Sequence, residues 1–152
     1  MRIEDIVKSV ELSPAKKIVL NILYTQNVLS ETFNEILKAH DLSPEQFNVL
    51  RILRGQKGKP ANMCTIQERM IAKTSNTTRL VDKLLLKELV TREVCPNNRR
   101  MMEVMITEKG LDVLQLLDPA VEEYEKRFAD NLSDDELKNL NFLLEKYRTI
   151  NE

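Results

Sequence analysis

The chain has 152 residues, of which 42% are hydrophobic and 31% are charged, and it contains three glycines and no tryptophan. This length and composition predict one domain, or one domain with helical extensions, in a helix-rich protein with few irregular loops. The formal net charge of −1 excludes a polycation that binds nucleic acid through bulk charge alone.

Charge is nevertheless distributed unevenly along the chain. Residues 1–61 carry 9 Lys and Arg against 7 Asp and Glu, residues 62–109 carry 9 against 6, and residues 110–152 carry 5 against 11. The middle segment therefore has a modest basic excess. If this segment binds DNA, its phosphate contacts must come from individually placed side chains and helix N-termini.

Metal, cofactor and catalytic sites have no support in the sequence. Cys64 and Cys95 form no Cys-x-x-Cys motif, and the single histidine, His40, is accompanied by no ligand set, nucleophile or partner carboxylate. We expect no metal, no cofactor and no enzymatic activity. The lack of a signal peptide and of a run of about 18 apolar residues predicts a cytoplasmic protein that does not bind membranes.

Residues 1–12 show no clear pattern, and the first strong signal is the cap pair Ser13 and Pro14. A helix of about 25 residues is predicted from there to about Ala39. Its apolar stripe is broad and requires one neighbour from its own chain and one from outside it. The stripe comprises Ile18, Val19, Ile22, Leu23, Leu29, Phe33, Ile36 and Leu37.

A second helix is predicted to begin at Ser43, because Gln46 completes a capping box with it. This helix is short and apolar on nearly all sides, which predicts that it is buried. Residues 55–60 contain two glycines and a proline and form the clearest loop of the chain.

Two more helices, at about residues 63–70 and 75–88, are predicted with a short turn between them. A β-like run at 89–94, a turn at 96–100 and a second alternating run at 102–106 follow. Two short helices and a hairpin with arginines at its tip are the outline of a winged helix-turn-helix. Any small α+β domain with a hairpin is the alternative.

Thr107 is predicted to cap the next helix, which runs to about Asn131 and which Pro119 is expected to kink. Its heptad seam consists of Leu114, Leu117, Val121, Tyr124 and Phe128. Ser133 and Glu136 form a third capping box and open a last helix, whose inward residues are expected to be Leu137, Leu140, Leu144 and Tyr147. The terminal helices carry more apolar surface than one chain covers, which predicts a homodimer. A monomer in which these helices pack on one another is the alternative.

Several linked segments resemble the core signature of the MarR family of bacterial transcriptional regulators. They are LSPEQFNVLRIL (42–53), TRLVDKL (78–84), KELVTR (87–92), NRR (98–100) and ITEKG (106–110). The chain departs from the family pattern at Gln67, where a small alanine is common, at Ile71, where a turn glycine is common, and at Asn98, where aspartate is common. These departures put the geometry of the turn and the bracing of the wing in question.

The resemblance implies a mainly α (α+β) winged helix-turn-helix with N- and C-terminal dimerisation helices. The corresponding segments are residues 1–40, 41–108 and 109–152. It further implies a regulator, acting as a repressor, that binds a pseudo-palindromic operator in double-stranded DNA as a homodimer. A small phenolic or lipophilic effector is expected to release the DNA by binding one dimer shape better than another. The effector pocket and its residues are not indicated by the sequence.

Within this framework, the residues at the start of the recognition helix are expected to contact bases in the major groove. They are Ser75, Asn76, Thr78 and Arg79, with Lys83 and Lys87 farther along at the DNA backbone. The wing residues Asn98, Arg99 and Arg100 are expected at the minor groove. The alternative for these residues is that they form an ordinary solvated helix face. The alternative for the whole protein is a winged-helix module that binds a protein partner and has no DNA sequence preference.

Oxidant sensing by Cys64 or Cys95 is a further alternative, because some family members sense oxidants through cysteine. Those members usually carry the reactive thiol in the N-terminal helical region, which has no cysteine here.

Overall fold

The computed structural model describes residues 1–8 and 11–149. The helices are α1 (Ile3–Val7), α2 (Pro14–Lys38), α3 (Pro44–Arg54), α4 (Met63–Arg69), α5 (Thr77–Leu86), α6 (Glu108–Ala129) and α7 (Asp134–Arg148). The strands are β1 (Ala61–Asn62), β2 (Val90–Cys95) and β3 (Asn98–Ile106). This element order confirms the predicted mainly α fold class with a winged helix-turn-helix.

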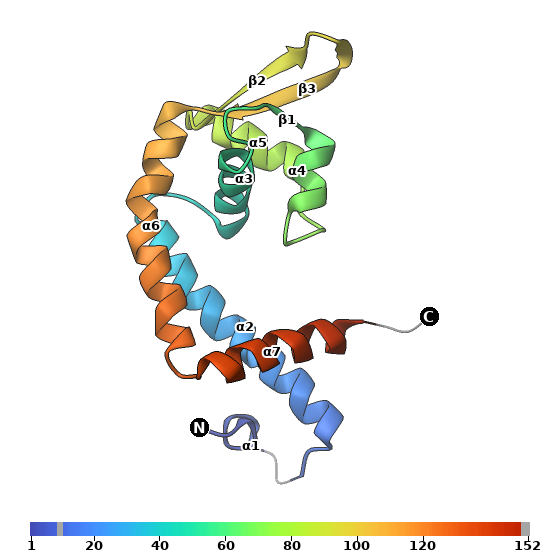
Figure 1. The fold of residues 1–152 in the computed structure, drawn as a ribbon, viewed down its shortest axis with the longest axis vertical. Coiled ribbons are helices and arrows are strands. Elements are labelled where there is room, and N and C mark those ends of the chain that lie inside the picture. Colours follow the sequence, from blue (N-terminus) through green and yellow to red (C-terminus); the bar gives the residue numbers. More distant parts are fainter. Residues whose placement is uncertain (9–10, 150–152) are drawn as a thin grey trace.

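We call residues 41–108, which the sequence predicts as the DNA-binding domain, the winged unit, and the helices before and after it the terminal helices (Figure 1). In the winged unit, α3, α4 and α5 pack beside a small antiparallel sheet of strand order β1-β3-β2, and the β2-β3 hairpin projects as the wing. Helices α2 and α6 lie against each other and lead away from this unit, and α7 follows at the far end of α6. The division at residues 40 and 108 remains a prediction from the sequence.

Side-chain caps start four helices at the residues that the sequence indicated. The cap residues of α2, α3, α6 and α7 are Ser13, Ser43, Thr107 and Ser133. Each hydroxyl oxygen accepts a hydrogen bond from a backbone N–H group in the first turn, which would otherwise lack a partner. Helix α6 continues through Pro119 as one helix.

The hydrophobic core joins the winged unit to the terminal helices. Its fully buried side chains include Leu37, Leu50, Leu53, Ile66, Leu84, Val104, Leu114 and Leu117. A row of aromatic rings continues this junction, because Phe33 of α2 lies 5.3 Å, centroid to centroid, from both Phe47 of α3 and Tyr124 of α6. The inward heptad seam of α6 is thus confirmed, and it packs against α2 and α3 of the same chain.

Three details differ from the sequence prediction. Helix α5 begins at Thr77 rather than Ser75, because the side chain of Asn76 caps the helix. Strand β3 already begins at Asn98, which pairs with Cys95 and shortens the predicted turn at 96–100 to two residues. The two-residue strand β1, which pairs with β3, was not predicted.

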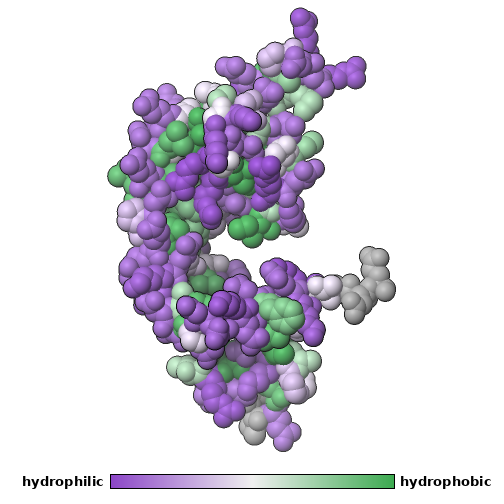
Figure 2. Space-filling model, viewed as in Figure 1, coloured by the Kyte–Doolittle hydropathy of each residue, from purple (hydrophilic) through white to green (hydrophobic). Residues whose placement is uncertain are grey.

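The apolar side chains of α7 are also placed differently from the prediction. Leu140, Leu144 and Tyr147, expected inward, are 44%, 38% and 49% exposed. The first half of α2 is open in the same way, at Ile18, Val19, Leu23 and Tyr24. Figure 2 shows hydrophobic side chains at the surface in the part of the molecule that α2 and α7 form. The monomer alternative requires the terminal helices to cover one another within a single chain. The exposed apolar faces show that they do not.

Candidate nucleic-acid interface

Helix α5 has one buried face and one exposed face. Thr77, Val81 and Leu84 are buried, and α5 contacts α3, β2 and α4 of the winged unit. The opposite face is exposed at Thr78, Arg79, Asp82, Lys83 and Leu86. Because i, i+3 and i+4 neighbours share a face, the first two turns of α5 offer hydroxyl and cationic groups to an external partner.

Asn76 and Ser75 lie before the first turn of α5 and not within it. The Asn76 side-chain oxygen accepts a hydrogen bond from the backbone N–H of Arg79 at 3.1 Å, so Asn76 is the N-cap. Ser75 is half-buried, and its backbone N–H donates to the carbonyl oxygen of Ala72 at 3.1 Å. The cap commits one lone pair of the Asn76 oxygen and leaves its amide N–H groups for other partners.

Two side chains organise the turn between α4 and α5. Gln67 donates from Nε2 to the carbonyl oxygen of Lys73 at 2.8 Å, and its Oε1 accepts a hydrogen bond from the hydroxyl of the buried Thr77. The backbone N–H of Ile71 donates to Oδ1 of Asn48 at 2.9 Å. No described residue between positions 70 and 77 has a positive φ, which explains why this turn needs no glycine.

The sequence did not reveal these two roles. The only signal was the departure of Gln67 and Ile71 from the family pattern. Nothing in the sequence pointed to Asn48, because Asn48 and its partner Ile71 are 23 positions apart. The turn that holds the N-terminus of α5 therefore depends on the side-chain contacts of Gln67 and Asn48.

The tip of the wing presents Arg99 and Arg100, which are both exposed. The Asn98 oxygen accepts a hydrogen bond from the backbone N–H of Arg100 at 3.1 Å. The neutral asparagine thus shapes the backbone at the tip, whereas no hydrogen bond to the Arg100 guanidinium is found among residues 1–8 and 11–149. At the end of β2, Cys95 is buried, while Cys64 on α4 is exposed.

The cations in and next to the winged unit differ in whether a carboxylate lies beside them. Arg92 of β2 donates to the Asp82 carboxylate at 2.6 Å, and the Lys109 ammonium lies 3.2 Å from the Glu88 carboxylate. Arg79, Lys83, Arg99 and Arg100 make no ion pair with any residue that the structure describes. Four exposed positive charges on α5 and the wing are therefore not neutralised by a carboxylate of the described chain.

Lys87 was expected at the DNA backbone, but the structure engages it elsewhere. Its ammonium lies 3.1 Å from the Asp41 carboxylate, in the turn between α2 and α3. It belongs to the internal contacts of the protein.

The described residues form neither a cluster of metal ligands nor a membrane-spanning helix. Residues 1–8 and 11–149 contain no group of three or more His, Cys, Asp and Glu side chains that could hold a metal ion. None of the helices described is both long enough and apolar enough to cross a membrane.

Known proteins resemble the chain in sequence and in fold. A model of the MarR family matches residues 42–102. The HTH-type transcriptional regulator MhqR of Bacillus subtilis (strain 168) is 32% identical over 102 residues, which cover 67% of this chain and 68% of that protein.

Two solved structures share the fold. A mutant MarR from E. coli complexed with operator DNA has a TM-score of 0.74 at 24% sequence identity, and the match covers 84% of this chain and 91% of that one. Bordetella bronchiseptica BpsR, whose DNA binding is regulated by 6-hydroxynicotinic acid, has a TM-score of 0.80 at 17% identity, with 93% and 99% covered. The similarity to these two structures, at 24% and 17% identity, shows the fold alone. The similarity to MhqR is also one of sequence. The chain belongs to the MarR family of transcriptional regulators.

Proposed function

We propose that the chain is a cytoplasmic repressor that binds a pseudo-palindromic DNA operator as a homodimer. The observation that carries the proposal is the set of exposed cations on α5 and the wing tip without a carboxylate partner among the described residues. Such cations release counterions when they meet DNA phosphates, which favours binding. The proposed activity is binding alone and involves no chemical step.

In this proposal α5 is the recognition helix and lies in the major groove. Thr78 and Arg79 are on its first turn and meet base edges, where arginine pairs with the two acceptors of guanine. Ser75 and Asn76 approach from the preceding turn, and the free amide N–H groups of Asn76 are donors to base or phosphate oxygens. Lys83, one turn farther on, contacts the DNA backbone.

The wing adds a second point of contact. The side chains of Arg99 and Arg100 extend from the hairpin tip and enter the minor groove, whose negative potential attracts arginine. Asn98 fixes the backbone of the tip through its hydrogen bond with the Arg100 N–H. The wing therefore contributes affinity and a preference for a narrow minor groove.

The homodimer follows from the open apolar faces of α2 and α7. Their exposed hydrophobic residues are Ile18, Val19, Leu23, Tyr24, Leu140, Phe142, Leu143, Leu144 and Tyr147. Isolated exposed apolar residues are ordinary, but a set that extends along the faces of two helices marks an interaction surface. A second copy with the same two helices covers this surface and places two recognition helices on successive major grooves.

A small phenolic or lipophilic effector completes the proposal. An open groove of about 590 Å³ lies between the end of α2, the turn before α3 and α5. Its lining is mostly polar and includes Lys38, Lys83, Lys87 and Asp41 beside the apolar Leu42 and Pro44. The lysines suit the acidic group of a ligand, and the two apolar residues suit its ring or chain. Such a ligand releases DNA if it binds the non-operator shape of the dimer more tightly.

The proposal is tested by selection from random duplexes. Purified protein is incubated with a random-sequence pool at about physiological salt, and the bound fraction is sequenced. We expect an enriched palindrome with half-sites about one helical turn apart. The Arg79→Ala variant is expected to lose roughly 1–3 kcal/mol of binding free energy and to relax base preference at one position per half-site.

Lys126→Ala is the matched control, because Lys126 is an exposed cation of α6 outside the winged unit. It should bind like the wild type. If Arg79→Ala retained full affinity and preference, the role of Arg79 would be wrong. If wild-type protein enriched no sequence and lost all DNA binding at moderate salt, the winged unit would be a protein-interaction module instead.

A further inference from the structure

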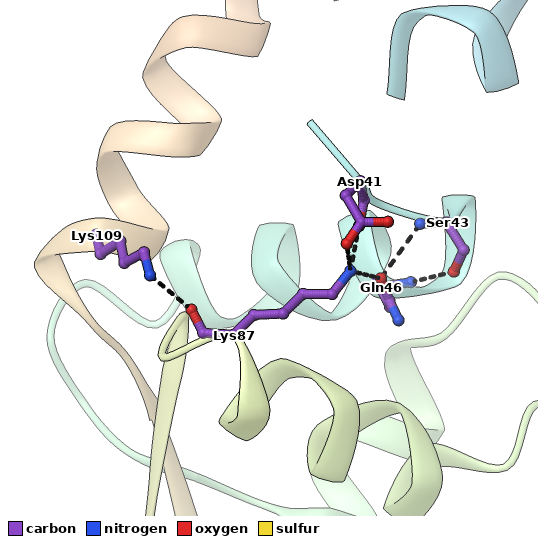
Figure 3. A network of polar contacts seen from close by, with 5 residues as sticks. All are labelled: Asp41, Ser43, Gln46, Lys87 and Lys109. Carbon is purple, nitrogen blue, oxygen red and sulfur yellow. Dashed lines mark hydrogen bonds and ion pairs between the residues drawn. The ribbon is translucent and has the colours of Figure 1, made fainter. Parts of the chain in front are cut away.

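Lys87 stands at the C-terminal end of the recognition helix, and three acceptors surround its ammonium group. These are the backbone carbonyl oxygen of Asp41, the carboxylate of Asp41 at 3.1 Å and Oε1 of Gln46 at 3.3 Å. The ammonium donates two hydrogen bonds, to the Asp41 carbonyl oxygen and to Gln46, and forms an ion pair with the Asp41 carboxylate. Figure 3 shows the extended Lys87 side chain reaching from α5 to these groups.

Lys109 of α6 also contacts the C-terminal end of α5. Its ammonium donates to the backbone carbonyl oxygen of Lys87 at 3.0 Å (Figure 3). It also donates to the Glu88 carboxylate at 3.2 Å. Lys109 is in the first turn of α6, and Asp41 follows the end of α2. The end of α5 is thus connected by polar contacts to both long helices that lead to the proposed dimer interface.

The segments joined in this way have well-defined backbones. Asp41 and Glu88 have left-handed φ values of 52° and 60°, each just after the end of a helix. The next residues, Leu42 and Leu89, donate backbone N–H groups back to the carbonyls of Leu37 and Leu84 at 3.2 Å and 3.0 Å. These are Schellman-type caps, which fix the direction in which the chain leaves α2 and α5. The lysine ammonium groups also complement the negative ends of these helices.

We infer that Lys87 is a positioning residue, which joins the end of the recognition helix to the α2-α3 turn and fixes the orientation of that helix relative to the dimerisation helices. The inference rests on the proposed function. Gln46 strengthens it, because its Oε1 accepts from both the Ser43 N–H and Lys87, so the contact is part of the α3 capping box. Lys87 therefore affects DNA binding without touching DNA.

The experiment compares Lys87→Met with Lys83→Met, which removes the same charge from the same helix. Affinity for the selected operator is measured over a range of salt concentrations. We expect Lys87→Met to weaken binding about 2- to 30-fold with an unchanged salt slope, and to accept operators with altered half-site spacing. Lys83→Met should instead reduce the slope by about 0.9 per subunit, because it loses a phosphate contact.

Asp41→Asn gives an independent test, because the two possible roles of Lys87 predict opposite changes in operator affinity. Asparagine tolerates the left-handed φ of this position, and the change leaves every cation in place. If Lys87 positions the helix, Asp41→Asn weakens operator binding in the same direction as Lys87→Met. If Lys87 contacts DNA, the released ammonium makes binding tighter and the salt slope steeper, and the inference is overturned.

Hydrogen exchange without DNA separates this inference from the proposed function. Backbone amides of residues 84–89 and 41–43 are expected to exchange faster in Lys87→Met than in Lys83→Met. Equal exchange in the two variants overturns the inference. A wild-type protein that selects no operator overturns the proposed function, and the exchange result still reports whether Lys87 holds the two segments together.

Discussion

Gly110, in the first turn of α6, occupies a site where an added methyl group has no room. A Cβ atom there would lie 2.4 Å from the carbonyl oxygen of Leu89 and 2.7 Å from Cγ1 of Ile106. Replacing glycine by alanine inside a helix normally gains about 1 kcal/mol. Overpacking costs about 1–3 kcal/mol, and this case belongs at the upper end because one clashing atom is backbone. Gly110→Ala should therefore lower the free energy of unfolding by about 2 kcal/mol.

Gly55 provides a matched control in the same chain. It ends α3 with a φ of −64°, and a Cβ there meets the Ile52 carbonyl oxygen at 3.3 Å, which a small shift relieves. Gly55→Ala is therefore expected to stabilise the protein by about 0.4–1 kcal/mol, mainly by restricting the unfolded chain.

The two variants are compared by urea unfolding at one protein concentration, because the stability of a dimer depends on concentration. The unfolding midpoint should fall for Gly110→Ala and rise for Gly55→Ala, with unchanged slopes. An unchanged or higher midpoint for Gly110→Ala would refute the reasoning, since it would mean that α6 separates from the Leu89 carbonyl without cost.

Two further predictions concern side-chain hydrogen bonds. Gln67→Ala removes the contacts to the Lys73 carbonyl and to the Thr77 hydroxyl. It should lower the free energy of unfolding, measured in urea, by about 1–2 kcal/mol. If the losses of Gln67→Ala and Thr77→Val simply added in the double variant, the two side chains would not be in direct contact. The backbone N–H and then the hydroxyl of Ser133 hold the pKa of Glu136 below its usual value by hydrogen bonding. The stabilisation is therefore present above the unfolded-state pKa and is lost as pH falls through the lower folded-state pKa. Helix content followed by circular dichroism should fall on acidification in the wild type and less in Glu136→Gln, and identical titrations would count against the cap.

Helix starts were predictable from the sequence because their determinants are local. Ser43 and Gln46 are three residues apart, and this spacing alone specifies the hydrogen bonds that open α3. The heptad seam of α6 likewise follows from spacing, and its members Leu114 and Leu117 are buried as expected. Side-chain chemistry within one or two turns was enough for these elements.

The contacts that orient α5 were not predictable in this way. Lys87 and Asp41 are 46 positions apart, and Ile71 and Asn48 are 23 apart, so no spacing rule relates them. From the sequence, Lys87 and Lys83 were both expected at the DNA backbone, since both are cations on the same face of the same helix. Only the fold shows that Lys87 reaches the exposed Asp41 carboxylate in the α2-α3 turn, whereas Lys83 has no carboxylate partner among the described residues.

The exposed face of α7 differs from the prediction for another reason. Amphipathic periodicity shows which side of a helix is apolar, but it does not show whether the covering surface belongs to the same chain. A helix of 15 residues gains most of its stability from packing of its apolar face, and α7 has no buried residue in the single chain. A partner outside the chain must supply that packing. Because the contacts of Lys87 and Lys109 connect the end of α5 to the α2-α3 turn and to α6, we expect that partner to influence the orientation of α5 as well.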